Sequence, residues 1–170
     1  MAKVAVMAMH RQVVMIGEAG IDKKIGDAPK ELQMEVLREH VRLSEMLCKP
    51  LIVHCVKAVD ELLAIRKEMK VTLPWVVHGF RGGKEQYEQL KRAGIYTSIS
   101  LFHDRELVQS MALTDILLET DDSQYCDIDD VYELIANELS MDKEELLCQV
   151  WRNIRYLLGW DLKQGANPPF

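Results

Sequence analysis

Short runs of apolar, β-branched residues alternate along the chain with longer stretches in which apolar residues recur every three or four positions. The short runs have the length and composition of buried strands, and the longer stretches have the period of amphipathic helices. The segment Lys3–Ala8 is a further strand candidate. The predicted strands are Val13–Gly17, Leu51–Cys55, Trp75–His78, Ile95–Ser100 and Asp115–Glu119.

Helical patterns fill the segments between these runs. Pro29 suits a first helical position, Gly94 suits a left-handed helix end, and Ser140 suits the N-cap of the last helix. The predicted helices are residues 29–47, Ala58–Met69, Lys84–Ala93, Arg105–Ala112, Ile128–Leu139 and Met141–Leu158. Since parallel strands need crossover helices, this alternation predicts an α/β protein with a parallel sheet, in a single domain over residues 1–170 with a tail at 160–170.

The composition is that of a globular domain, with 170 residues, of which 48% are apolar and 28% charged. The net charge of −6 argues against a broad basic surface for duplex nucleic acid, but it leaves room for a small cationic pocket for one phosphate. The six-residue apolar run near the start is too short to span a bilayer. The four cysteines lack CxxC spacing, so we expect reduced, mostly buried thiols in a cytoplasmic protein, with a disulfide pair as the alternative.

Polar side chains close four of the predicted strands. Glu18 ends VVMIGE, His54 ends LIVH, His78 ends WVVH, and Asp121 ends ILLETD. In a parallel α/β barrel the carboxyl ends of the strands converge on one rim. A lone histidine at a strand end is ordinarily a hydrogen-bonded core residue, but two histidines and two carboxylates at equivalent positions favour a divalent metal site. The remaining histidines, His10, His40 and His103, lack this context.

Five segments, in order between residues 13 and 159, resemble the TatD family of metal-dependent hydrolases. The family's GE-x-G-x-D segment is similar to VVMIGEAGID, its H-x-R-x-A strand to PLIVHCVKA, and its H-C-F-x-G strand to VVHGFRGG. Its E-T-D-S-P strand is similar to LLETDDS, the strand before it to GIYTSIS, and the asparagine of its final helix to Asn153. The resemblance implies a TIM-barrel-like (β/α) fold, a one- or two-metal site, and deoxyribonuclease or phosphoesterase activity.

The same resemblance implies a role for each matching residue. Glu18 would bridge metals, His54 and His78 would ligate one metal, and Asp121 would bind a metal and take the proton from water. Zinc, manganese and magnesium all remain open, because imidazole and carboxylate suit each of them to a different degree. Cys55 alternates to the opposite strand face from His54, so we expect no cysteine ligand.

Three departures separate the chain from the family pattern. The opening H-x-H-x-D strand is missing, Val56 replaces the arginine of H-x-R-x-A, and TDDSQ lacks the proline of the fourth motif. With five or six strands where a closed barrel has eight, we expect an N-terminally shortened, incomplete barrel lacking the first strands. A second metal could not be completed, so activity should be weakened. An open strand edge should favour self-association.

Other polar residues have two readings each. Arg81, beside the Gly82-Gly83 pair, either binds a phosphate oxygen or faces solvent. Lys57 is a poor substitute for the absent arginine or a surface lysine, and Glu119 orients a ligand or forms a buried ion pair. Asp22 and Asp122 read as loop and cap residues, with support of a metal ligand as the alternative.

Three functions remain open on this basis. The first is metal-dependent hydrolysis of a DNA end or a small phosphodiester. The second is a catalytically impaired or inactive remnant with a scaffold or structural role. The third is hydrolysis of a C–N or C–O bond.

Overall fold

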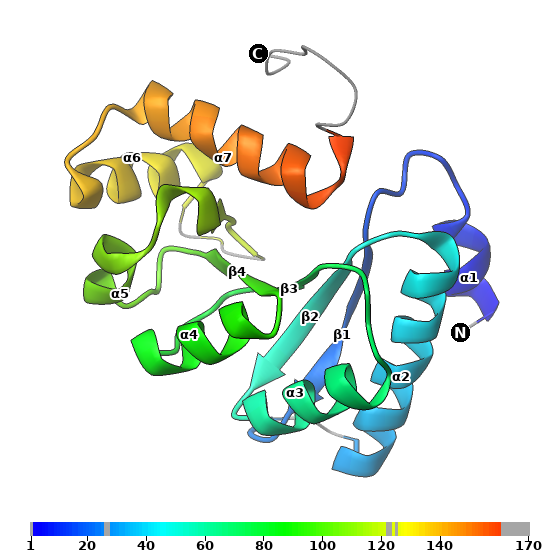
Figure 1. Cartoon of the computed structure of the whole chain (residues 1–170). Helices are drawn as coiled ribbons and strands as arrows, with labels where there is room; N and C mark the ends of the chain where they lie inside the picture. Colours follow the sequence, from blue (N-terminus) through cyan, green and yellow to red (C-terminus); the bar gives the residue numbers. More distant parts are fainter. Residues whose placement is uncertain (1, 26–27, 122–123, 125, 161–170) are drawn as a thin grey trace. The chain divides into compact units, whose positions relative to one another are not determined.

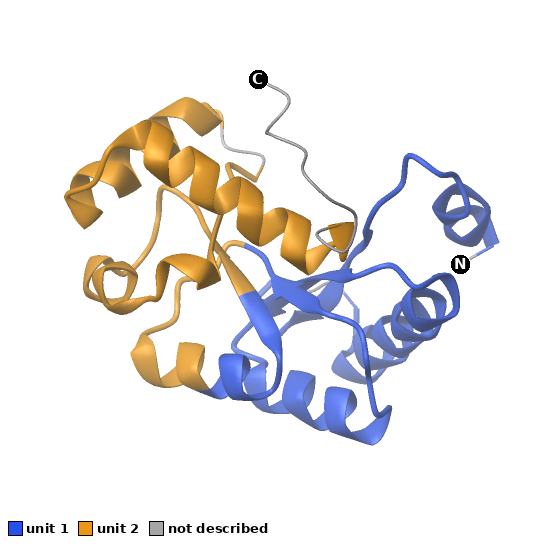
Figure 2. Cartoon of the chain, turned by 45° about the horizontal axis from the view of Figure 1, so that its top comes forward, with its two compact units in different colours: residues 1–78, 89–96 blue, residues 79–88, 97–170 orange. Residues whose placement is uncertain are grey.

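The computed structural model describes residues 2–25, 28–121, 124 and 126–160 (Figure 1). The chain divides into two compact units, which are coloured separately in Figure 2. The first unit comprises residues 1–78 and 89–96, and the second comprises residues 79–88 and 97–170. The predicted tail, 160–170, lies outside the described residues except for Trp160.

Helices and strands alternate through both units. The first unit contains α1 (Ala2–Ala8), β1 (Ile16–Asp22), α2 (Lys30–Leu47), β2 (Leu51–Val56), α3 (Val59–Glu68) and β3 (Trp75–Val77). The boundary between the units falls within α4 (Lys84–Arg92) and β4 (Ile95–Ile99). The second unit continues with α5 (Arg105–Ser110), the 3-10 helix η1 (Leu113–Asp115), β5 (Ile116–Leu118), α6 (Ile128–Leu139) and α7 (Lys143–Leu157).

The five strands form one sheet in the order β1-β2-β3-β4-β5. The pairs β1–β2, β2–β3 and β4–β5 run parallel. Among the described residues β1 and β5 do not pair with each other, so the sheet is open rather than closed. The prediction of a parallel α/β fold with an incomplete barrel-like sheet is therefore confirmed.

Each unit has an apolar core built on its strands. In the first unit α2 packs on β1 and β2 and α3 packs on β2, which buries Leu37, Val41, Leu62 and Ile65 almost completely. In the second unit α6 and α7 pack on each other and on β5. The buried side chains there include Ile116, Val131, Ile135, Leu146 and Val150. Burial of this kind stabilises a fold by about 25 cal/mol per Å² of apolar surface.

Several predicted element boundaries were wrong. The candidate strand Lys3–Ala8 is the helix α1, with Val6 and Met7 largely exposed. The first strand begins later than predicted and runs on to Asp22. Ser140 is the left-handed C-cap of α6 rather than the N-cap of α7, because the Asp142 side chain accepts hydrogen bonds from the first turn of α7.

The cysteines are free thiols, as the sequence predicted, but they are less buried than expected. Cys48 is exposed, whereas Cys55, Cys126 and Cys148 are half-buried. Burial raises the pKa of the Cys55 thiol, so it stays protonated near neutral pH. Within the part of the chain that the structure describes, none of the helices combines the length and apolar character needed to cross a bilayer.

Candidate metal centre

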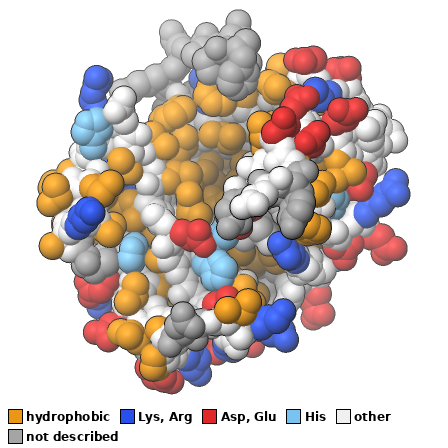
Figure 3. All heavy atoms as spheres, turned by 180° about the vertical axis from the view of Figure 1, so that it is seen from behind, with side chains coloured by type: hydrophobic (Ala, Val, Ile, Leu, Met, Phe, Trp, Pro, Cys, Tyr) orange, Lys and Arg blue, Asp and Glu red, His pale blue; other side chains and the backbone are white. Residues whose placement is uncertain are grey.

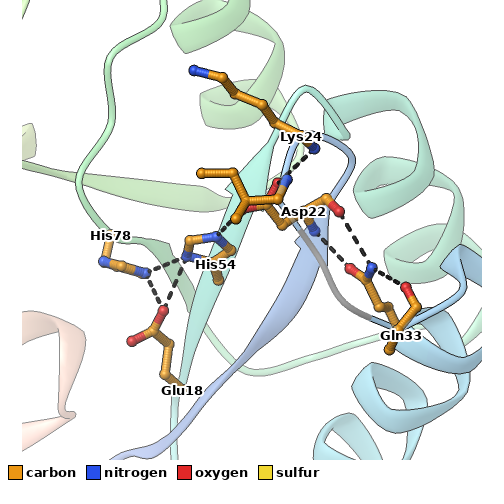
Figure 4. A network of polar contacts seen from close by, with 8 residues as sticks. Glu18, Asp22, Lys24, Gln33, His54 and His78 are labelled. Atoms are coloured by element: carbon orange, nitrogen blue, oxygen red, sulfur yellow. Dashed lines mark hydrogen bonds and ion pairs between the residues drawn. The ribbon is translucent and has the colours of Figure 1, made fainter.

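Three predicted ligands from three neighbouring segments come together in the first unit. Glu18 lies in β1, His54 lies in β2, and His78 directly follows β3 (Figure 4). The His54 Nδ1 atom lies 3.1 Å from Glu18 Oε1 and 3.1 Å from His78 Nε2. The His78 Nε2 atom also contacts Glu18 Oε1. One oxygen and two nitrogens thus face a common point.

Strand pairing explains why these side chains meet. In the parallel pair β1–β2, Gly20 lies opposite His54, and a Cβ atom at position 20 would lie 1.8 Å from the His54 carbonyl oxygen. The two backbones can approach this closely only because residue 20 is a glycine. In the next pair, the His78 N–H donates to the Val53 carbonyl at 3.1 Å, which aligns the end of β3 with β2.

The strand-end placement predicted for all of these residues was only partly right. His78 does follow the last residue of β3, but Glu18 lies inside β1 and His54 inside β2. The pairing register of β1 shifts between Ile16 and Ala19, the interval that contains Glu18. Such an irregularity redirects a side chain out of the regular alternation of a strand. Glu18 therefore reaches the histidines from within the strand.

The three side chains differ in exposure. The side chain of Glu18 is 46% exposed, that of His54 is 35% exposed and that of His78 is 11% exposed. Figure 3 shows a face of the molecule on which histidine and acidic side chains reach the surface. A ligand from solvent can therefore reach the oxygen and the nitrogens without unfolding the unit.

The donor set fits a divalent cation. All three ligand atoms lie within 4.8 Å of one another. Ligand atoms bonded at about 2.0–2.1 Å in a tetrahedral site are about 3.3–3.4 Å apart. The separations of His54 Nδ1 from Glu18 Oε1 and from His78 Nε2, both 3.1 Å, are close to this value, and the third pair is closer still. Two imidazole nitrogens and one carboxylate oxygen are a donor set typical of catalytic zinc, and manganese also accepts it. No cysteine belongs to the group within the described residues.

A second group of polar contacts lies behind His54. The Asp22 Oδ2 atom lies 3.2 Å from His54 Nε2, on the opposite side of the ring from Glu18 (Figure 4). The other carboxylate oxygen, Oδ1, accepts the backbone N–H groups of Lys24 at 2.6 Å and Ile25 at 2.9 Å. The hydrogen bonds from Ile25 and Lys24, with a smaller contribution from His54, lower the pKa of Asp22. The sequence had indicated a loop or cap residue here, with support of a metal ligand as the alternative, and the structure places Asp22 at the end of β1.

The remaining predicted site residues belong to the second unit. Asp121 follows β5 with a left-handed backbone, φ 54°. The Arg81 guanidinium lies 5.1 Å from the ring centroid of Phe102, a cation–π contact that the sequence did not predict. Glu119 accepts a hydrogen bond from Ser98 Oγ at 2.8 Å. The three-residue centre therefore forms within the first unit alone, and Asp122 lies outside the described residues.

The other candidates have separate environments. Lys57 is exposed, with φ 55°. His40 is buried and donates to the Val36 carbonyl, and His10 accepts the Gln12 N–H. His103 contacts the Ser100 carbonyl and Glu138 through its two ring nitrogens. Each of these histidines thus has contacts outside the candidate metal centre.

The sequence is similar to curated proteins that are named as TatD or as metal-dependent hydrolases. The chain is 34% identical over 123 residues to the uncharacterized metal-dependent hydrolase YcfH of Escherichia coli (strain K12), over 68% of this chain and 46% of that protein. It is 32% identical over 124 residues to the 3'-5' ssDNA/RNA exonuclease TatD of Erwinia billingiae, over 68% of this chain and 48% of that protein. The chain spans about half the length of these curated relatives.

Solved structures show the same relationship. YJJV, a TatD homolog from Escherichia coli K12, has a TM-score of 0.75 and 25% identity over 90% of this chain and 68% of that one. A TatD family hydrolase from Entamoeba histolytica has a TM-score of 0.75 at 19% identity, over 86% of this chain and 63% of that one, and supports the fold alone. The family model described as TatD related DNase matches residues 1–159. The chain belongs to the TatD-related DNase family of metal-dependent hydrolases.

Proposed function

We propose that this protein hydrolyses phosphodiester bonds with the help of a divalent metal held by Glu18, His54 and His78. The observation that carries the proposal is the convergence of the Glu18 Oε1, His54 Nδ1 and His78 Nε2 atoms. A metal in such a site lowers the pKa of a coordinated water to about 7, so that a nucleophile forms at neutral pH. Zinc, manganese and magnesium are the candidates.

Two residues of the second unit complete the proposal. Asp121, which matches the aspartate of the family's fourth motif, would add a carboxylate ligand and accept the proton from the attacking water. Arg81 would bind a phosphate oxygen, since its guanidinium donates hydrogen bonds in a planar fork. The ring of Phe102 supports that guanidinium from one side.

The relatives and the charge support the proposed class of substrate. One relative is named a 3'-5' ssDNA/RNA exonuclease. A net charge of −6 suits a protein that binds a strand end or a small phosphodiester through one local site rather than along a duplex. We propose that residues 1–170 belong to one hydrolase domain, with the family resemblance over residues 13–159, and that it works in the cytoplasm.

Metal binding is the first test. The purified chain should retain or bind one equivalent of zinc or manganese, measured by elemental analysis after dialysis. His54→Ala should abolish stoichiometric binding, because it removes one of the three donors. His10→Ala is the matched control, since His10 is exposed and lies outside the centre. A full metal equivalent in His54→Ala would refute the ligand assignment.

Activity is the second test, measured as nitrophenol release from a phosphodiester and nucleotide release from single-stranded DNA, with each metal added in turn. Asp121→Asn should lower the rate by about 10²–10⁴, as expected for the loss of a general base. Arg81→Ala should mainly raise KM. Equal rates for the wild type and Asp121→Asn would exclude the proposed role of Asp121. A metal-bound wild type that is inert with every metal would favour the alternative of an inactive scaffold.

A further inference from the structure

The two ring nitrogens of His54 have different surroundings. The Nδ1 atom faces Glu18 Oε1 and His78 Nε2, each at 3.1 Å, and the Nε2 atom faces Asp22 Oδ2 at 3.2 Å (Figure 4). A neutral imidazole carries a proton on only one nitrogen, and only the other nitrogen has a lone pair for a metal. The position of that single proton therefore decides whether His54 can act as a ligand.

The Asp22 carboxylate is held so that it can only accept from His54. Its Oδ1 atom already accepts the N–H groups of Lys24 and Ile25, which leaves Oδ2 directed at the ring. An ionised carboxylate has no proton to donate, so the hydrogen of this contact comes from His54 Nε2. The carboxylate that faces Nδ1, Glu18, is more exposed than Asp22 (46% against 18%) and has a second donor in His78 Nε2, so it competes less for the ring proton. The Nδ1 lone pair is then directed at Glu18 and His78.

Gln33 fixes the backbone that carries this carboxylate. The Gln33 Oε1 atom accepts the Asp22 N–H at 2.7 Å, and the Gln33 Nε2 group donates to the carbonyls of Asp22 at 3.2 Å and Ala28 at 2.7 Å. Gln33 lies in the first turn and a half of α2, so the helix anchors the end of β1. The chain of contacts runs from α2 through Asp22 to His54.

We infer that Asp22 is a positioning residue: held by Gln33 and by the turn at Lys24 and Ile25, it keeps the proton of His54 on Nε2 and the Nδ1 lone pair facing Glu18 and His78. The inference rests on the proposed function for its metal-binding consequence, but the tautomer itself is a property of the metal-free chain. A purely structural Asp22 would close the same turn without affecting the ring proton.

The variant Asp22→Asn separates the two roles. The asparagine Oδ1 atom can still accept the turn N–H groups of Lys24 and Ile25, so the local fold is kept. Its amide nitrogen would then face His54 Nε2 and donate to it, which moves the ring proton to Nδ1. Asp60→Asn, which removes an exposed carboxylate on α3, is the matched control for the change of charge.

Two measurements test the inference. Two-bond ¹⁵N–¹H correlation spectra of the metal-free chain report the ring tautomer, with the His54 signals assigned by their absence in His54→Gln. Wild type and Asp60→Asn should show the Nε2–H form, and Asp22→Asn the Nδ1–H form. The zinc Kd, measured by competition with a chromophoric chelator, should rise about 10–100-fold in Asp22→Asn, as is typical when a partner of a histidine ligand is changed.

The outcomes decide between the possibilities. An Nε2–H ring in folded Asp22→Asn overturns the inference, whatever the affinity does. If the wild type binds no zinc, the proposed function fails, and the tautomer comparison still judges Asp22. If Asp22→Asn does not fold, Asp22→Ser replaces it, because the hydroxyl keeps a turn acceptor but is too short to reach His54. A single Nε2–H form in Asp22→Ser would likewise overturn the inference.

Discussion

Replacement of Asn153 by alanine should destabilise the second unit, because the hydrogen bonds of its side-chain amide are lost. Asn153 lies in α7 and is 7% exposed. Its Nδ2 group donates to the carbonyls of Leu113 at 2.7 Å and Ile116 at 2.8 Å, and its Oδ1 atom accepts from Gln149 Nε2 at 2.8 Å. The two bonds from Nδ2 tie α7 to η1 and to the start of β5, the strand that leads to Asp121. Asn153→Ala removes all three.

The magnitude follows from the burial of each acceptor. The bond to the Ile116 carbonyl is buried, and an unsatisfied buried acceptor costs about 1–3 kcal/mol. The bond to the Leu113 carbonyl is only part-buried, so its loss costs about 0.5–1.5 kcal/mol. Together the free energy of unfolding should fall by about 3 kcal/mol. For a chain of this length that corresponds to a decrease in Tm of about 6–12 °C.

Chemical denaturation followed by circular dichroism measures this change, with Gln149→Ala as the control. The control loses only the Gln149–Asn153 bond, and should lower the free energy of unfolding by about 1 kcal/mol or less. If Asn153→Ala and Gln149→Ala have the same denaturation midpoint, the two carbonyl bonds contribute nothing and the reasoning is wrong.

Two further predictions concern pH and assembly. Burial raises the pKa of Glu45, but hydrogen bonds from Thr72 and Leu73 outweigh this and hold it below the ordinary value of 4.5. The carboxylate therefore stabilises the fold above that pH and loses this contribution as the pH falls through its lowered pKa. The stability difference between wild type and Glu45→Gln, from urea denaturation, should shrink from pH 7 to pH 3, and a constant difference would contradict this. The open strand edges of the sheet should favour self-association at micromolar concentration, whereas a monodisperse monomer in light scattering would exclude it.

Periodicity predicted the long elements well because their burial is regular. The helix Ile128–Leu139 has the predicted bounds, and the other predicted helices differ from those of the structure by one or two residues at an end. Each of the five predicted strands has a counterpart in the sheet. The N-terminal segment failed because its short apolar run suits a helix as well as a strand, and alanine and methionine favour a helix. Its alternating Val4 and Val6 are not buried against a sheet.

The site was predictable in its residue types but not in its geometry. The order of the motifs predicted that Glu18, His54 and His78 lie together, and in the structure their ligand atoms are neighbours. The first strand was placed too early, because Gly17, Ala19 and Gly20 have low β-propensity although they form β1. The role of Asp22 depends on a contact between residues 32 positions apart, and no local pattern in the sequence encodes that distance.

The close pairing of Gly20 with His54 means that this glycine can be retained for the sake of the fold, independently of any metal site. A side chain at position 20 would collide with the neighbouring backbone, so selection for the sheet alone is enough to preserve this glycine. A lineage that kept the fold without a metal centre would retain Gly20, while Glu18 and His54 would be free to change. In a survey of genomes, the glycine therefore marks descent, and only the carboxylate and the two imidazoles bear on the proposed metal-dependent activity.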